Sequence, residues 1–170
     1  MKWKKVCLGV LTLFFLLGVD QVTKYLAALH LKESDALVLF PGVFELRYLE
    51  NYGAAFGVLQ NQRLLLLAIT SVVLLIVCFF YWKIPSEKRY LPMRCTVICI
   101  AAGAVGNMVD RFFYGYVIDF FYFCLIDFPI FNVADIYVSV GTAVLAALIL
   151  FYYRDEELNR LLDGRKKGAA

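Results

Sequence analysis

Four long apolar segments constrain this chain more than any other feature. They cover approximately residues 6–29, 64–82, 91–109 and 133–153. Each is close to the ~20 apolar residues that an α-helix needs to cross the hydrocarbon core of a bilayer. The chain is 62% hydrophobic and only 18% charged, which is too apolar for an ordinary soluble domain. The sequence therefore predicts an α-helical integral membrane protein with four transmembrane helices in one domain, residues 1–153.

The positive charges of the chain are concentrated beside three of the segment ends. Twelve of the 17 Lys and Arg residues precede the first segment, lie in or beside the connection between the second and third, or follow the fourth. Because positive charge marks cytoplasmic loops, both termini are predicted to be cytoplasmic and the connections 30–63 and 110–132 to face outward. Residues 154–170 are then a charged cytoplasmic tail, which we expect to fray. The twelve basic residues are Lys2, Lys4, Lys5, Lys83, Lys88, Arg89, Arg94, Arg154, Arg160, Arg165, Lys166 and Lys167.

The first outward connection contains a strand pattern. Residues 44–50 alternate apolar and polar side chains, as in a half-buried strand. Pro41 and Gly42 precede them as a turn. We therefore expect a small extracytoplasmic β element on the outer membrane surface, with one face on lipid headgroups or on a bound ligand.

The N-terminal segment and the cysteines allow plain interpretations. No small-residue cleavage pattern follows the first apolar run, so it is expected to be a retained helix. Four of the five cysteines fall within apolar segments and only Cys124 lies in an outward loop. An odd number without an outward partner argues against disulfides.

Two aspartates stand in apolar surroundings, Asp119 in the second outward connection and Asp135 at the outer end of the fourth segment. Ionisable groups are costly beside lipid, so such a residue is by default a functional hypothesis. Two carboxyl groups held close together share one proton. The ionised group can then activate a water molecule while the protonated group polarises a carbonyl. Asp135 alone would also suit the first turn of a helix as a capping residue.

Further polar residues map to the same outer depth. Asp20 and Lys24 are spaced i, i+4 in the first segment, the favourable order for an ion pair. The outer end of the third segment carries Asn107 beside Asp110 and Arg111, for which an ion pair between the last two or with a neighbour is the plain interpretation. Three other candidates are Asn51, Gly53 and Asn132.

Several other kinds of site are disfavoured by composition. His30 is the only histidine, and no H-E-x-x-H pattern is present, so zinc and haem sites built on several histidines are excluded. No serine lies in a G-x-S-x-G context and there is no phosphate-binding glycine loop. We expect no metal, no cofactor and no nucleic-acid partner.

Five short motifs occur in order along the chain and give it a recognisable resemblance. The sequence resembles lipoprotein signal peptidase, also called signal peptidase II, the aspartyl peptidase family of the bacterial inner membrane. The motifs cover essentially the whole membrane domain. They are residues 20–24 (DQVTK), 51–56 (NYGAAF), 106–111 (GNMVDR), 117–120 (VIDF) and 131–135 (FNVAD).

This resemblance implies a set of roles. Asp119 and Asp135 are implied to be the catalytic pair, near the outer face of the membrane. The family's substrates are prolipoproteins whose lipobox cysteine already carries diacylglycerol, and cleavage falls just before that cysteine. Membrane lipid is the other expected partner, and the enzyme is expected to be monomeric. The residues implied to support or line the site are Asp20, Lys24, Asn51, Gly53, Asn107, Arg111 and Asn132.

Two other hypotheses remain open from the residues alone. A small proton-coupled transporter would use Asp20, Lys24, Asp110 and Asp135 as a relay, although such proteins usually show repeats and broken helices at the midplane, and the sequence shows neither. A non-catalytic membrane scaffold would use the polar groups only to pack helices.

Overall fold

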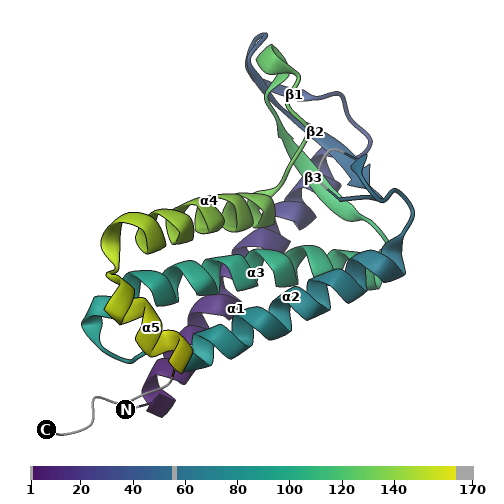
Figure 1. Ribbon diagram of the computed structural model, residues 1–170. Coiled ribbons are helices and arrows are strands. Elements are labelled where there is room, and N and C mark those ends of the chain that lie inside the picture. Colours follow the sequence, from purple (N-terminus) through teal and green to yellow (C-terminus); the bar gives the residue numbers. More distant parts are fainter. Residues whose placement is uncertain (1, 55–56, 164–170) are drawn as a thin grey trace, which may run out of the picture.

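The fold is a bundle of long helices with a small sheet at one end (Figure 1). The computed structural model describes residues 2–54 and 57–163. Ala55 and Phe56 of the second motif, and the basic residues Arg165, Lys166 and Lys167 of the predicted tail, lie outside the described residues. The elements in chain order are α1 (Lys2–Leu31), β1 (Leu37–Phe40), β2 (Phe44–Asn51), α2 (Arg63–Lys83), η2 (Lys88–Tyr90), α3 (Leu91–Phe113), β3 (Val117–Tyr122), η3 (Cys124–Ile126), α4 (Val133–Ala147), the π-helical turn η4 (Leu148–Tyr152) and α5 (Asp155–Asp163).

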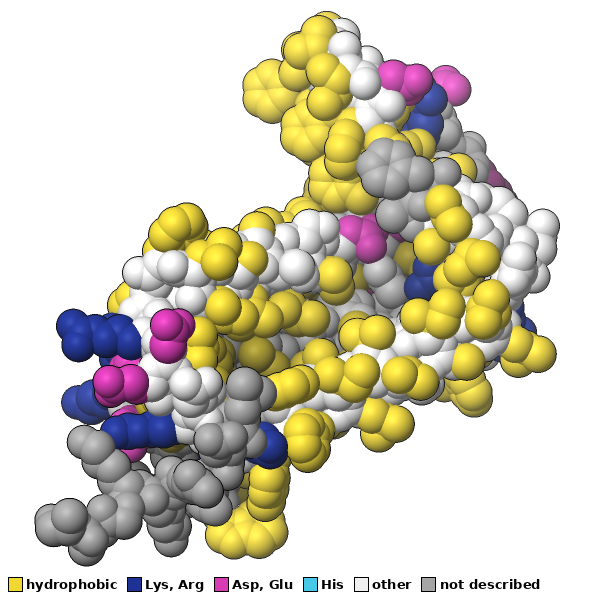
Figure 2. Space-filling view, viewed as in Figure 1, with side chains coloured by type: hydrophobic (Ala, Val, Ile, Leu, Met, Phe, Trp, Pro, Cys, Tyr) yellow, Lys and Arg dark blue, Asp and Glu magenta, His cyan; other side chains and the backbone are white. Residues whose placement is uncertain are grey.

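The four predicted transmembrane segments are confirmed as helices. Four helices are long and apolar enough to cross a membrane: Trp3–Leu31, Arg63–Lys83, Lys88–Phe113 and Val133–Tyr152. Their outer surfaces expose large apolar side chains, such as Leu64, Leu75 and Phe15, and Figure 2 shows these side chains covering the helices. A surface of this kind suits lipid as the surrounding solvent.

Helix α3 is the centre of the bundle and packs against α1, α2 and α4. Two of its glycines make the close approach possible. A Cβ at Gly103 would overlap the carbonyl oxygen of Ala134 in α4, and one at Gly106 would lie 2.5 Å from Asp20 Oδ2 in α1. Small residues let helix backbones approach closely in membranes, and here they bring the polar ends of three helices together.

The sheet has three antiparallel strands in the order β1-β2-β3. Strand β2 confirms the strand expected from the alternating pattern over residues 44–50. A buried cluster of Ala27, Leu31, Ile118 and Phe120 fixes the sheet to the end of α1. In the β2–β3 ladder Leu49 pairs with Asp119, which directs both side chains to the same face of the sheet. The sheet thus positions the first aspartate at the end of the bundle.

The expectation of a fraying tail is wrong for residues 155–163, which form helix α5. Its apolar side chains Leu158 and Leu161 pack against a core cluster that includes Tyr90 and Tyr153. Arg89 adds an ion pair to Glu157, with Nε 3.0 Å from Oε1. Helix α5 carries its charges on one face, and burial of its apolar face against the core cluster holds the helix in place.

All five cysteines are free thiols, as predicted.

Candidate active site

Asp119 and Asp135 are brought together by a single asparagine. Asn132 Nδ2 donates a hydrogen bond to Asp119 Oδ1 (2.6 Å), and its backbone N–H donates to Asp135 Oδ2 (3.1 Å). Asn132 is completely buried. The two carboxyl groups, sixteen positions apart in the sequence, therefore both contact one residue, Asp119 through its side chain and Asp135 through its backbone N–H.

The start of α4 explains why the chain folds in this way at Asp135. Asn132 is the N-cap, with an extended backbone, and its Oδ1 accepts from the Asp135 N–H (2.9 Å). The reciprocal bond from the Asn132 N–H to Asp135 completes a capping box. The capping role considered for Asp135 is thus real. Asp135 Oδ1 also accepts from Asn107 Nδ2 (2.7 Å), so capping does not account for all contacts of the Asp135 carboxylate.

Asp119 is the more deeply buried of the two acids, with 1% of its surface exposed. Asn51 Nδ2 donates to its Oδ2 (2.9 Å), and Asn132 holds the other oxygen. Burial, and after it the nearby charge of Asp135, raise the pKa of Asp119 to about 7. Near neutral pH this carboxyl group can therefore carry a proton.

This pKa predicts a pH-dependent stability. The folded pKa of Asp119 is about 7 against 3.8 for an unperturbed aspartate, so the folded state binds a proton that the unfolded state releases. The contribution of the raised Asp119 pKa to the free energy of unfolding is complete below pH ~4 and is lost as the pH rises towards ~7. In detergent, Asp119→Asn should flatten this decline relative to wild type. A control, Asp35→Asn, changes the net charge equally at an exposed position and should retain the wild-type slope. If the stability of Asp119→Asn falls with pH as steeply as that of wild type, the raised pKa is not that of Asp119.

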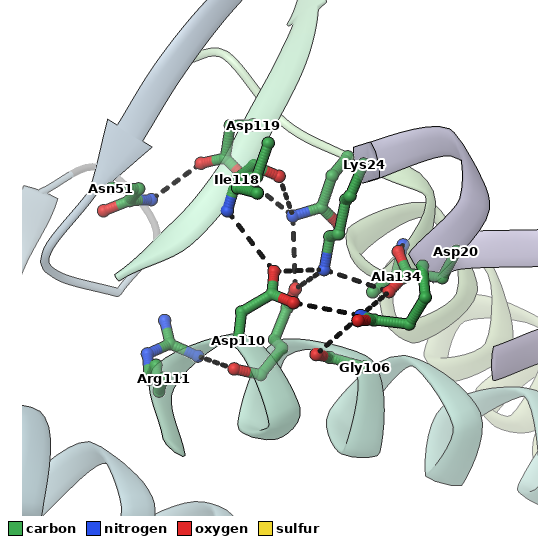
Figure 3. A network of polar contacts seen from close by, with 12 residues as sticks. Asp20, Lys24, Asn51, Gly106, Asp110, Arg111, Ile118, Asp119 and Ala134 are labelled. Carbon is green, nitrogen blue, oxygen red and sulfur yellow. Dashed lines mark hydrogen bonds and ion pairs between the residues drawn. The ribbon is translucent and has the colours of Figure 1, made fainter. Parts of the chain in front are cut away.

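A second buried cluster lies beneath the aspartates, centred on Lys24 (Figure 3). Its ammonium lies 3.0 Å from Asp20 Oδ2 and 2.8 Å from Asp110 Oδ2. All three side chains have no more than 2% of their surface exposed. The third Lys24 hydrogen bond goes to Asn107 Oδ1 (2.9 Å), which connects this cluster to the aspartate pair.

The expected ion pair between Asp110 and Arg111 is replaced by contacts to other elements. Asp110 pairs with Lys24 of α1 and accepts from the Ile118 N–H of β3 (3.3 Å). Arg111 Nη2 donates to the Gly53 carbonyl (2.7 Å), and Nη1 to the Asn107 carbonyl (3.4 Å). Adjacent residues on a helix point in directions about 100° apart, so these two side chains reach different partners.

The segment after β2 is fixed by a local turn. Asn51 Oδ1 accepts from the Gly53 N–H (2.9 Å), an Asx-type turn, while its Nδ2 is on Asp119. Gly53 is buried, and a Cβ there would lie 2.8 Å from the Val58 carbonyl oxygen. Asn51 thus supports Asp119, and Gly53 connects the same loop to Arg111.

All nine candidate residues therefore lie in one connected region, but two further donors in it were missed. Gln21 Nε2 donates to Asp110 Oδ1 (2.9 Å) and Asp20 Oδ2 (3.1 Å). The Ala134 N–H donates to Asp20 Oδ1 (2.9 Å). The only sequence signal for Gln21 was its place in the first motif, and a backbone N–H carries no signal at all.

The region is open on one side. In Figure 2 acidic surface lies at the bottom of a hollow between the sheet and the helices. Asp135 is only half-buried. Among residues 2–54 and 57–163, no group of three or more His, Cys, Asp or Glu side chains is arranged to hold a metal ion.

This fold and this site define a class of protein: a multi-pass membrane protein with paired carboxyl groups at the end of the bundle that carries a sheet. The chain belongs to the signal peptidase (SPase) II family, whose family model matches residues 12–151. It is thus an aspartic peptidase by family. This membership favours neither the transporter nor the scaffold hypothesis.

Related proteins match most of the chain. A lipoprotein signal peptidase of Caldanaerobacter subterraneus subsp. tengcongensis is 39% identical over 145 residues, covering 85% of this chain and 97% of that protein. One from Streptococcus thermophilus (strain CNRZ 1066) is 37% identical over 153 residues, covering 90% and 96%. A solved structure, described as a bacterial membrane enzyme determined by the in meso method at 2.3 Å resolution, superposes with a TM-score of 0.74 at 28% identity, covering 97% of this chain and 95% of that one.

Proposed function

We propose that this chain cleaves the signal peptide from diacylglyceryl-modified prolipoproteins, just before the lipidated cysteine, with Asp119 and Asp135 as its catalytic pair. The observation that carries this proposal is Asn132, which contacts both carboxyl groups at once. The family and the relatives named lipoprotein signal peptidase support the substrate class.

The surroundings of the two acids suggest separate roles. Asp135 is half-buried beside the hollow, where a water molecule can approach it, which suits a carboxylate acting as general base. Asp119 is buried and its raised pKa suits a protonated acid. Asp135 takes a proton from water as the water oxygen attacks the scissile carbonyl. Asp119 donates its proton to the carbonyl oxygen, which gives a tetrahedral gem-diol and leaves Asp119 ionised. As the C–N bond breaks, Asp135 gives the proton taken from water to the leaving amine, and one gem-diol hydroxyl returns a proton to Asp119, so the pair again holds a single proton.

The formal charges around the pair support one retained proton. Asp20 and Asp110 are balanced by Lys24 and Arg111, so these four groups are neutral together. Any charge on the catalytic pair is then uncompensated in a region poor in water. Two ionised carboxylates there would repel each other strongly, so the pair is expected to hold one proton between its members.

The substrate class is tested with a matched pair of precursors. Purified enzyme in detergent should cleave a precursor peptide whose lipobox cysteine carries diacylglycerol, and should leave the unlipidated peptide intact under the same conditions. Mass spectrometry of the products identifies the bond, which should be the one before the cysteine. Equal cleavage of both peptides, or cleavage elsewhere, would contradict the proposed substrate.

We further propose that the enzyme lies in the bacterial cytoplasmic (inner) membrane with both termini in the cytoplasm and the site near the outer face. The sheet-bearing end of the bundle has few basic residues, while Lys4, Lys5 and Lys83 gather at the other end. At the sheet end, β1 exposes an apolar run that includes Phe40, which suits contact with the outer leaflet. The candidate site residues all come from one chain, so a monomer suffices.

Cysteine labelling tests this orientation. In a variant without native cysteines, Ser34→Cys in the loop after α1 should react with a membrane-impermeant maleimide in intact cells. Glu156→Cys in α5 should react only after the membrane is permeabilised. Both positions are exposed, so accessibility of the side chain is matched. The opposite labelling pattern would invert the proposed topology.

A further inference from the structure

We propose that Lys24 and Asn107 act as a positioning pair for Asp135: the ammonium of Lys24 fixes the side-chain amide of Asn107 in the orientation that directs an N–H at the Asp135 carboxylate. The inference rests on the proposed function of Asp135 as general base. It assigns a specific task to two residues that support the site.

The contacts of Asn107 determine which end of its amide faces each neighbour. Its Oδ1 accepts from Lys24 Nζ (2.9 Å) and from Asn132 Nδ2 (3.1 Å). Its Nδ2 donates to Asp135 Oδ1 (2.7 Å). A half-turn of the amide would place N–H groups against two donors and an oxygen against a carboxylate. All three contacts therefore favour one orientation.

Lys24 is held firmly enough to set that orientation. An ammonium has three N–H groups, and three acceptors surround this one: Asp20, Asp110 and Asn107. The side chain is 2% exposed. Gly106 leaves room for Asp20 beside α3, since a Cβ there would lie 2.5 Å from Asp20 Oδ2. The buried ion cluster thus fixes the position of a donor, in addition to packing α1 against α3.

The catalytic consequence concerns the direction of the Asp135 side chain. Its Oδ2 is fixed by the helix cap through Asn132, whereas its Oδ1 depends on Asn107. A general base must hold its lone pair towards the attacking water, and small misplacements of a catalytic group lower the rate strongly. Loss of the Asn107 donor should therefore reduce kcat and leave KM largely unchanged.

Asn107→Asp is the most direct test, because it retains the shape and the acceptor for Lys24 but replaces the donor facing Asp135 by an oxygen. At pH 7 we expect kcat to fall by roughly 10²-fold. At lower pH the new carboxyl group takes up a proton and can donate again, so activity should recover and the pH optimum should move to lower pH. The charged and titratable groups around this position are Asp20 and Lys24 of α1, Asp110 and Arg111 of α3, Asp119 of β3, and Asp135 of α4.

Variants of Lys24 separate positioning from folding. Lys24→Gln keeps an N–H donor for Asn107 and Lys24→Met keeps none, while both remove the charge between Asp20 and Asp110. We expect Gln to retain a higher kcat than Met at equal thermal stability in detergent. Gln21→Met is the matched control, since the hydrogen bonds that Gln21 makes to the described residues go to Asp20, Asp110 and the Gly106 carbonyl and not to Asn107. It should lower stability without moving the pH optimum.

The outcomes of this test are distinct from those of the proposed function. A wild-type enzyme that fails to cleave the lipidated precursor would overturn the proposed function itself. With an active wild type, an Asn107→Asp profile that superimposes on it would overturn the positioning pair. Equal kcat in Lys24→Gln and Lys24→Met at equal stability would do the same, and this comparison holds even if Asn107→Asp does not fold.

Discussion

Asp119→Asn and Asp135→Asn should each reduce cleavage of a lipidated precursor by roughly 10³-fold or more, in a protein that still folds. Asn cannot accept a proton from water or donate an acidic proton to a carbonyl. The two variants should be about equally inactive, and the double variant little worse than either, because the acids act as one unit. The measurement is single-turnover cleavage in detergent.

The surroundings make these substitutions informative. At residue 135, an Asn side-chain oxygen can still accept from the Asn132 N–H, so the cap of α4 is retained. At residue 119 the new side chain has the same size in a buried site. Each new amide also places its NH2 group against a donor, Asn51 or Asn132 at residue 119 and Asn107 at residue 135, so thermal unfolding is measured beside activity to separate a chemical loss from a structural one. Asp127→Asn, at an exposed aspartate in the connection between α3 and α4, should cleave normally. Near-normal turnover by either Asp variant would refute the catalytic pair.

Gly103→Ala should be the most damaging glycine substitution in the bundle. The added Cβ would overlap the carbonyl oxygen of Ala134 and lie 2.8 Å from Val138 Cγ2. Because a backbone atom of α4 cannot rotate away, α3 and α4 must separate. Overpacking of this kind costs about 1–3 kcal/mol or more. The shift also reaches Asp135, the next residue after Ala134, so activity should fall with stability.

Two other glycines provide a graded comparison in the same assay, thermal unfolding in detergent. At Gly141 a Cβ would lie 2.8 Å from Ile100 Cγ1, a side-chain atom that can move, so the loss should be smaller. At Gly18 nothing lies within 4 Å, and Ala should be neutral or stabilise by about 0.5–1 kcal/mol through helix propensity. If Gly103→Ala and Gly18→Ala unfold at the same temperature, close α3–α4 packing does not limit stability.

The membrane helices could be predicted because one physical requirement, the burial of about 20 residues in hydrocarbon, determines both their length and their composition. Strand β3 was not predicted: Asp119 interrupts its apolar run, and its pairing with β2 connects segments separated by two helices. Helix α5 was missed because its charges suggested a solvated tail, and because the surface that Leu158 and Leu161 cover includes Tyr90, which is distant in sequence and stacks on Tyr153.

Which residues belong to the site was easier to predict than which of them contact each other. The sequence analysis placed Lys24, Asn107 and Asp135 at a common depth, the predicted outer ends of the helices. The motifs supplied the other candidate site residues. Which acid pairs with Lys24 could not be foreseen, since Asp110 comes from a helix 86 positions further along the chain. Such contacts depend on helix rotation and on the close approach at Gly106, and neither follows from local sequence.

The order of the elements also bears on how the enzyme is made. Asn51 and Asp119 belong to segments synthesised before α4, whereas Asp135 lies in the first turn of the last membrane helix. A chain still emerging from the ribosome thus lacks the proposed base until this final helix enters the bilayer. The N-cap residue of this helix, Asn132, also makes the contacts to Asp119 and Asn107, so the candidate site is complete only once α4 has packed against α3 and the sheet.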